Sequence, residues 1–211
     1  MSMFKFIAEI REFFNPYLAC QLCAIGRQQY YGLCHDCWTE LPWQHELVYK
    51  QQMCFYSACR YCYPMDRIIQ QFKYQQQLQF QALLAGLLLQ LQLPKVQALV
   101  AMPISTQRLN TRGYNQALLI AKIIAKVRNI PIWQPIIRTH QHAQTGLNRF
   151  ERLDNIYHQF HIKPRLDRHY HHILIIDDVV TTGNSILALK HSLTLLGCTQ
   201  IYACCIAHTP S

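Results

Sequence analysis

The segment from Ile173 to Ser185 (ILIIDDVVTTGNS) concentrates polar residues that could bind a ligand. Asp177 and Asp178 follow an apolar run that predicts a buried strand, and Thr181–Ser185 leads into a predicted helix. Backbone N–H groups and hydroxyls at a helix N-terminus favour a phosphate, and Gly183 lets the backbone close around it. The two aspartates would repel phosphate, but they can accept hydrogen bonds from ribose hydroxyls or bind a divalent cation. The segment therefore predicts a ribose 5-phosphate site; the alternative, a solvated acidic turn before a capped helix, leaves the paired aspartates unexplained.

Four cysteines near the N-terminus, Cys20, Cys23, Cys34 and Cys37, form two CxxC pairs with residues 24–33 between them. Each CxxC turn directs two thiolates to one point, so two such turns can hold Zn²⁺ in a closed tetrahedral site. Free buried thiols, a redox pair and a site in which His35 replaces one thiolate are the alternatives. The spacing favours a structural zinc module.

The other cysteines do not complete a second site of this kind. Cys54, Cys59 and Cys62 contain one CxxC pair and no fourth ligand nearby, so we expect small buried residues there. The remaining three, Cys198, Cys204 and Cys205, lie around the last predicted strand and are expected to belong to the core.

Composition limits the class of protein. A chain of 211 residues with 51% hydrophobic and 15% charged residues predicts one folded domain with an appendage. A formal net charge of +9 makes phosphates and nucleic acid suitable partners. The longest apolar run, residues 82–89, is too short to span a membrane, and the charged N-terminus is unlike a signal peptide. We therefore expect no membrane span and a cytoplasmic location.

Strands and helices alternate after the cysteines, which predicts an α/β fold with a doubly wound parallel sheet. We divide the chain into an N-terminal helix and zinc-ribbon-like module, residues 1–45, and an α/β domain, residues 46–211. The predicted helices are residues 4–14, 65–73, 78–93, 113–126 and 185–196. The predicted strands are 53–63 (running into the helix opened by Pro64), 98–102, 131–137, 172–176 and 200–207, with loops at 138–155 and 177–184 and an irregular stretch at 161–168.

Several of these motifs together resemble a known family. Asp177–Ser185 matches the phosphoribosyl pyrophosphate (PRPP) motif of type I phosphoribosyltransferases. Combined with the CxxC pairs and Arg112–Gln116 (RGYNQ), the chain resembles the competence protein F family from the cysteines to the C-terminus. Spaced polar and apolar residues in the predicted loop add to the resemblance, namely Gln144, Leu147, Arg152 and Asn155.

The resemblance implies a type I phosphoribosyltransferase fold that binds PRPP with Mg²⁺. Asp177 and Asp178 would contact the ribose diol, and the 5-phosphate would be held by Thr181, Thr182, Gly183, Asn184 and Ser185. It also implies a cytoplasmic role in natural transformation, in which incoming single-stranded DNA passes towards recombination. A DNA-uptake helicase or a recombination protein is then an expected partner.

Basic residues lie where a pyrophosphate or a nucleic-acid backbone could be met. Residues 103–105 follow a predicted strand, the position of the pyrophosphate loop in such folds. Arg108 and Arg112 come next and are our candidates for stabilising a departing pyrophosphate; the plain alternative is a solvated surface charge. The candidates for nucleic-acid contact are Lys73, Arg112, Arg149 and Arg152, the last two in the loop 138–155, whose closure would exclude water.

Three functions are compatible with these sequence features. The first is a PRPP-binding competence protein that handles single-stranded DNA, with catalysis as a phosphoribosyltransferase left open. The second is a metabolic phosphoribosyltransferase with a nucleobase or amine acceptor, for which we find no acceptor pocket in the sequence. The third is a zinc-dependent scaffold that retains a relict PRPP site. We favour the first because the motifs occur in combination.

Overall fold

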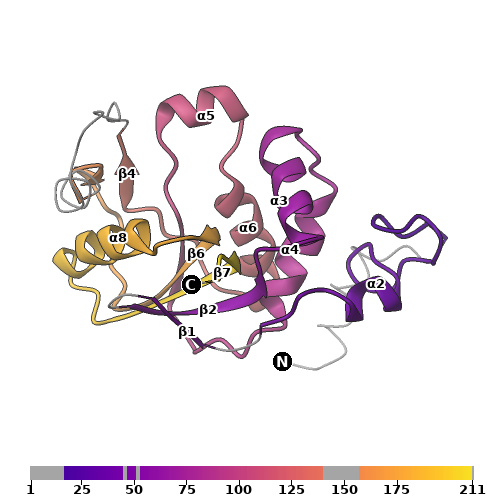
Figure 1. The fold of residues 1–211 in the computed structure, drawn as a ribbon. Helices are drawn as coiled ribbons and strands as arrows, with labels where there is room; N and C mark the ends of the chain where they lie inside the picture. The colour runs from indigo at the N-terminus through magenta and orange to yellow at the C-terminus, as the bar shows by residue number, and fades with distance from the viewer. Residues whose placement is uncertain (1–16, 45–46, 51–52, 140–156, 211) are drawn as a thin grey trace.

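The computed structural model describes residues 17–44, 47–50, 53–139 and 157–210 (Figure 1). Its helices are α2 (His35–Thr39), α3 (Met65–Tyr74), α4 (Phe80–Leu89), α5 (Thr106–Arg112), α6 (Gln116–Arg128) and α8 (Asn184–Leu195). Its strands are β1 (Leu47–Lys50), β2 (Met53–Arg60), β3 (Ala98–Ala101), β4 (Ile136–Arg138), β5 (Phe160–Ile162), β6 (His172–Val180) and β7 (Gln200–His208). The predicted helix at residues 4–14 and most of the predicted loop 138–155 lie outside the described residues.

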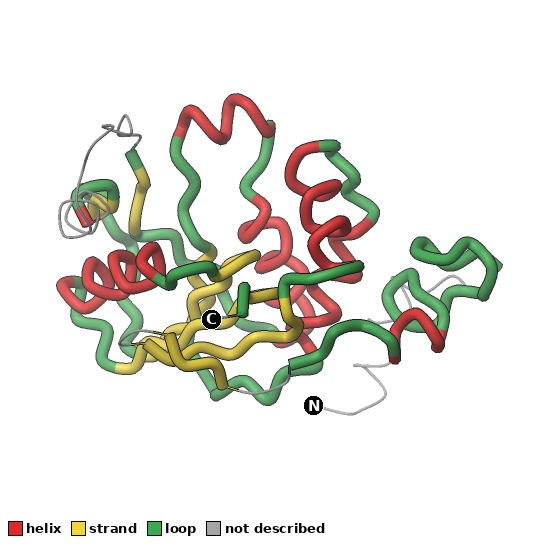
Figure 2. Tube along the Cα trace, viewed as in Figure 1, coloured by secondary structure: helices red, strands yellow, loops and turns green. Residues whose placement is uncertain are grey.

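A five-stranded sheet forms the centre of the fold, in the order β1-β2-β7-β6-β3. The neighbours β2, β7, β6 and β3 run parallel, and β1 pairs with β2 as an antiparallel edge. Strands β4 and β5 form a separate antiparallel pair (Figure 2). The predicted α/β fold with a parallel sheet is confirmed, and the continuous apolar strands are those that are buried on both faces.

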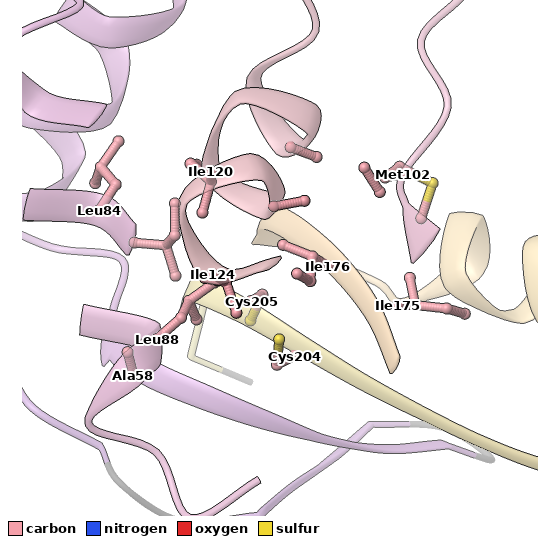
Figure 3. Packing of buried hydrophobic residues seen from close by; sticks show 14 of the residues in the cluster. Ala58, Leu84, Leu88, Met102, Ile120, Ile124, Ile175, Ile176, Cys204 and Cys205 are labelled. Carbon is pink, nitrogen blue, oxygen red and sulfur yellow. The ribbon is translucent and has the colours of Figure 1, made fainter. Parts of the chain in front are cut away.

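Helices α4 and α6 cover one face of the sheet. Ile120 and Ile124 of α6 are fully buried, and Figure 3 shows them on the same side of the sheet as Ile176 of β6. Ile175 points away from them, as the alternation of side chains along a strand requires. Residues Ile173–Ile176 are therefore buried on both faces, which fixes the position of the strand that carries the aspartates.

The predicted loop 177–184 is wrong in part, because β6 continues to Val180. Val179 and Val180 are β-branched apolar residues, and they pair with Ala207 and His208 of β7. Asp177 and Asp178 therefore lie within the strand, and only residues 181–183 form the loop before α8.

The other boundary errors have local causes. The helix predicted from residue 113 starts at Gln116, because Gly113 adopts φ +81° and ends the unpredicted helix α5. The helix predicted over 78–93 is confined to α4, and the strand predicted over 131–137 forms only at its end, in β4. The stretch 161–168 was predicted irregular, but its first residues belong to β5.

Tyr31 of the cysteine module packs against helix α4 of the α/β domain. Tyr31 is 7% exposed, and its ring lies 2.4 Å from the position of a Cβ atom built on Gly86 of α4. The missing side chain of Gly86 thus admits the ring to the helix surface. The domain division at residue 45 remains a prediction.

This contact predicts the sign of a substitution that helix propensity alone would get wrong. In a helix interior, Gly→Ala usually stabilises by about 1 kcal/mol. We expect Gly86→Ala to lower the free energy of unfolding instead, by about 1–3 kcal/mol, because the methyl group overlaps the Tyr31 ring. Urea unfolding of Gly86→Ala in the wild-type and Tyr31→Leu backgrounds measures this. The smaller side chain should restore the usual benefit, and a stabilised single variant would contradict the docking contact.

Candidate functional site

The aspartates stand where β6 extends beyond its neighbour. Strand β3 pairs with β6 only as far as Ile176, whereas β7 continues to pair with β6 up to Val180. The chain that leaves β3 turns away towards α5, and a cavity of about 410 Å³ opens beside the aspartates. It is lined by Lys73, Tyr74, Met102, Pro103, Ile104, Arg108, Arg112, Asn115, Gln116, Ala117, Arg138, Asp177, Asp178, Val179 and Ser185.

Asp177 and Asp178 experience different surroundings in this cavity. Burial, followed by the charge of Asp178, raises the pKa of Asp177 to about 7, although Lys73 and Arg138 oppose the shift. Asp178 forms an ion pair with Lys73, with 2.9 Å between Oδ2 and Nζ. The Asp178 and Lys73 side chains are 14% and 17% exposed, so solvent screens this pair only partly. The Lys73 charge thus compensates the carboxylate pair in this structure.

A second, smaller cavity of about 50 Å³ lies around the loop Thr181–Gly183 and the start of α8. Gly183 precedes α8 as its N-cap and adopts φ +84°, a left-handed conformation that glycine reaches without the steric cost of a side chain. The Asn184 N–H faces the Thr182 hydroxyl at 3.5 Å. Asp177, Val179 and Ser185 line both cavities, so the predicted diol and phosphate residues border adjoining cavities.

Lys50 is a functional candidate that the sequence did not reveal. Its ammonium group donates to the carbonyl of Thr181 at 2.8 Å and to the hydroxyl of Thr209 at 3.1 Å. It also donates to the Thr209 carbonyl. The Thr209 N–H donates in turn to the Val180 carbonyl, so β1 and the residue after β7 both anchor the loop Thr181–Gly183. No local pattern marks Lys50, because it meets the loop only through the sheet.

The RGYNQ segment connects three parts of the cavity wall. Arg112 lies over the Tyr74 ring, with its guanidinium carbon 4.9 Å from the ring centroid, and donates to the Tyr74 hydroxyl at 3.3 Å. Tyr114 donates its hydroxyl proton to the carbonyl of Phe72. Asn115 caps α6 and donates to the carbonyl of Met102 at 3.0 Å. The motif thus ties α3, α6 and the chain that leaves β3 together.

Arg138 is the second residue that sequence reasoning missed. It lies in β4, donates through Nε and Nη2 to the Gln159 side chain at 3.1 Å, and stacks over Phe160 at 5.0 Å. Burial, followed by Arg108, lowers the pKa of Arg138, and Asp177 opposes that shift. The cavity therefore contains four cationic side chains against two carboxylates, an excess that suits an oxyanion ligand.

The nucleic-acid candidates are not equally placed. Lys73 is engaged by Asp178, and Arg112 is stacked on Tyr74, so both belong to the cavity. Arg108 is exposed at its wall. Arg149 and Arg152 lie outside the described residues.

The structure brings the four predicted metal-binding cysteines together. The sulfur atoms of Cys20, Cys23, Cys34 and Cys37 all lie within 4.8 Å of one another. Cys23 and Cys34 are 3.8 Å apart, close to the separation of about 3.8 Å expected for tetrahedral ligands with zinc–sulfur bonds of about 2.3 Å. Backbone N–H groups of Gly26 and its neighbour lower the pKa of Cys23 to about 6. A four-thiolate site such as one for zinc fits this arrangement.

The predictions of burial for the remaining cysteines are confirmed for four residues and wrong for two. Cys59 is buried as expected, but Cys54 and Cys62 are exposed, so the expectation of burial was wrong for these two. Cys54 is an exposed residue of β2, and Cys62 follows the end of that strand. Over the described ranges the cysteine cluster is the only group of three or more suitable ligands, and it excludes His35. The last three, Cys198, Cys204 and Cys205, are buried as predicted.

The helices of the described ranges are all too short or too polar to cross a membrane. No family model matches the chain.

Curated relatives confirm the resemblance drawn from the motifs. The chain is 29% identical over 199 residues to competence protein F of Haemophilus influenzae, which covers 88% of this chain and 82% of the relative. It is 28% identical over 218 residues to DNA utilization protein YhgH of Salmonella typhimurium, covering 90% of each. The YhgH protein of Escherichia coli K12 is 25% identical over 203 residues, covering 90% of this chain and 84% of that protein. The chain is therefore similar to competence and DNA utilization proteins over most of its length.

Solved structures that resemble the chain include two phosphoribosyltransferase-type enzymes. The glutamine PRPP amidotransferase of B. subtilis has a TM-score of 0.41 and 13% identity, over 57% of this chain and 24% of that chain. The purine phosphoribosyltransferase of Pyrococcus horikoshii has a TM-score of 0.29 and 18% identity, over 69% and 73%. Overlaps of this size carry no weight for function.

The cysteine geometry predicts a specific metal content. Cys23→Ser should abolish stoichiometric zinc and lower the thermal midpoint, because a metal that binds only the folded state stabilises it. Cys54→Ser, on an exposed sulfur outside the cluster, should change neither quantity. Elemental analysis of purified protein and a thermal melt measure both, and equal zinc in the two variants would exclude the four-thiolate site.

Proposed function

We propose that this protein is a competence-related protein that binds PRPP with Mg²⁺ and handles single-stranded DNA during natural transformation. The observation that carries the proposal is that the cavity at the aspartates of β6, lined by cationic side chains, adjoins the cavity at the loop Thr181–Gly183. The similarity to competence protein F and YhgH supports the DNA-related role. A cytoplasmic location and a helicase or recombination partner belong to the same proposal.

The chemistry of each part suits a different portion of PRPP. Carboxylates accept hydrogen bonds from the ribose hydroxyls, and their oxygen atoms are the ligands that Mg²⁺ prefers. The loop Thr181–Ser185 offers N–H groups and hydroxyls to the 5-phosphate at the start of α8. Lys50 donates to the Thr181 carbonyl and would thereby help to fix the loop that holds the 5-phosphate. In a transfer reaction, Arg108 and Arg112 would stabilise the charge that develops on departing pyrophosphate.

The raised pKa of Asp177 predicts a pH dependence of binding. Protonation of the carboxyl near pH 7 removes an acceptor for the ribose diol, so PRPP affinity should fall as the pH is lowered. Between pH 8 and pH 6 we expect a loss of about tenfold, measured by calorimetry with excess Mg²⁺. Asp177→Asn should bind weakly at both values and retain only the slope that comes from the ligand. Equal slopes in the two proteins would contradict the assignment.

The same carboxyl predicts an opposite dependence for the ligand-free fold. The folded state holds the proton up to about pH 7, whereas the unfolded chain releases it near 3.8. Raising the pH through this window should therefore lower the free energy of unfolding. Urea unfolding should show this loss in wild type and a reduced loss in Asp177→Asn. The groups that face Asp177 are Asp178, Lys73 and Arg138, with the buried thiols of Cys204 and Cys205 behind it.

A basic groove beyond the β3 edge supports the DNA-binding part of the proposal. A cavity of about 420 Å³ is lined by Lys163, Arg165 and Arg168, with Asp167 as its one carboxylate. Neither ion pair of the described residues involves these three cations. Of the two aromatic rings in its wall, Tyr170 is half-buried and packs at 71° against Trp133, which is buried with 7% exposure. Cationic side chains beside aromatic rings are the usual means of binding single strands.

The groove lies far from the aspartates, so the two ligands can be tested separately. Tyr170 precedes β6 and Asp177 lies towards its end, roughly 20 Å further along the strand. Arg165→Gln/Arg168→Gln should reduce oligo-dT affinity and make its logarithmic salt dependence shallower by about 1.4. PRPP binding should not change.

The matched control is Lys122→Gln/Lys190→Gln, which removes the same charge from exposed positions on α6 and α8. Fluorescence anisotropy at several salt concentrations measures all three proteins. If both double variants lose affinity equally, only the net charge of the protein matters and the groove is not the DNA site.

A further inference from the structure

Gln116 ends the RGYNQ segment and has no role in the proposed function. Its side chain is buried, with 3% exposure, and it lines the cavity beside Asp177. Its Nε2 atom finds no hydrogen-bond partner in the described part of the chain and has almost no contact with solvent. A buried amide donor without a partner costs free energy, so its presence in a cavity wall points to a ligand that satisfies it.

The position of Gln116 on α6 identifies the chemistry of that ligand. Gln116 is the first residue of a 13-residue helix, and its first turn contains no acidic side chain. The positive end of the helix dipole is therefore not offset by a carboxylate on the same helix. Asn115 satisfies the N–H of Leu118 at 3.1 Å, which leaves the Gln116 amide as a side-chain donor at this helix end.

The charges around the same end of the cavity favour an oxyanion. Arg112 precedes Gln116 by four residues, and Arg108 lies one turn further back on α5; both line the cavity. The terminal torsion of a glutamine is soft, so a small rotation can turn Nε2 towards a bound oxygen.

We propose that Gln116 and the N-terminus of α6 form a phosphoryl-oxygen subsite, in which the Gln116 amide donates to an oxygen of the ligand. The inference rests on the proposed function, which supplies two sources of that chemistry. One is the diphosphate of PRPP, and the other is a phosphodiester of single-stranded DNA that enters the cavity.

Gln116→Met removes the donor and keeps the length of the side chain. If the oxygen belongs to the diphosphate, PRPP and inorganic pyrophosphate should bind about tenfold more weakly, and ribose 5-phosphate should bind as before. If it belongs to DNA, oligo-dT affinity should fall and PRPP affinity should stay. Gln116→Glu should weaken the same ligand further, because it places a carboxyl against the anion.

A stability measurement separates a ligand-contacting role from a structural one. Gln116→Met should leave the thermal midpoint of the ligand-free protein unchanged or raise it, because it removes an unsatisfied buried donor. The matched control is Gln28→Met in the cysteine module, where a residue that is 6% exposed donates to the Ala19 carbonyl at 2.9 Å. That variant should lower the thermal midpoint and leave ligand affinities alone.

The outcomes distinguish this inference from the function on which it rests. Wild-type protein that binds neither PRPP nor oligo-dT overturns the proposed function. Wild-type protein that binds them, with Gln116→Met binding every ligand equally well, overturns the subsite alone. A thermal midpoint that falls in Gln116→Met as it does in Gln28→Met, with unchanged affinities, assigns Gln116 a structural role and also overturns the subsite.

Discussion

Two adjacent carboxyl groups in the last part of strand β6 set the main electrostatic constraint on this fold. Burying like charges is unfavourable unless protons or cations compensate them. Here a raised pKa allows Asp177 to retain its proton near neutral pH, and Lys73 pairs with Asp178. Arg138 reaches the same region from β4, although β4 is not part of the main sheet. Distant segments of the chain are thus drawn together around one charge pair.

This arrangement links the stability of the fold to its proposed function. Without ligand, Lys73 forms an ion pair with Asp178, whose carboxylate would bind the ribose diol or Mg²⁺ in the proposed function. The unpartnered amide of Gln116 and the excess of cations are likewise unfavourable features in a ligand-free cavity, and an anionic ligand would relieve both. Buried groups that are costly until a ligand arrives are typical of sites built for binding.

The sequence predicted those parts of the site that are contiguous in the chain. One segment of the chain contains the apolar strand, the paired aspartates, the glycine loop and the following helix. The CxxC spacing likewise indicates a local turn. Lys50 and Arg138 could not be predicted this way, because their relation to the site exists only through strand pairing. The extension of β6 to Val180 was missed for the same reason, since pairing with β7 decides where the strand ends. Helix α5 escaped prediction because it is short and none of its residues is buried, so it lacks an apolar period.

The central claim is that PRPP binds with its ribose against Asp177 and Asp178 and its 5-phosphate at Thr181–Ser185. A crystal structure of the zinc-loaded protein with PRPP and Mg²⁺ tests it most directly. We expect the diol at the two carboxylates, the phosphate within the loop, and Lys73 displaced from its 2.9 Å contact with Asp178. Density for PRPP elsewhere, with the Lys73–Asp178 pair intact and the loop empty, would contradict the account.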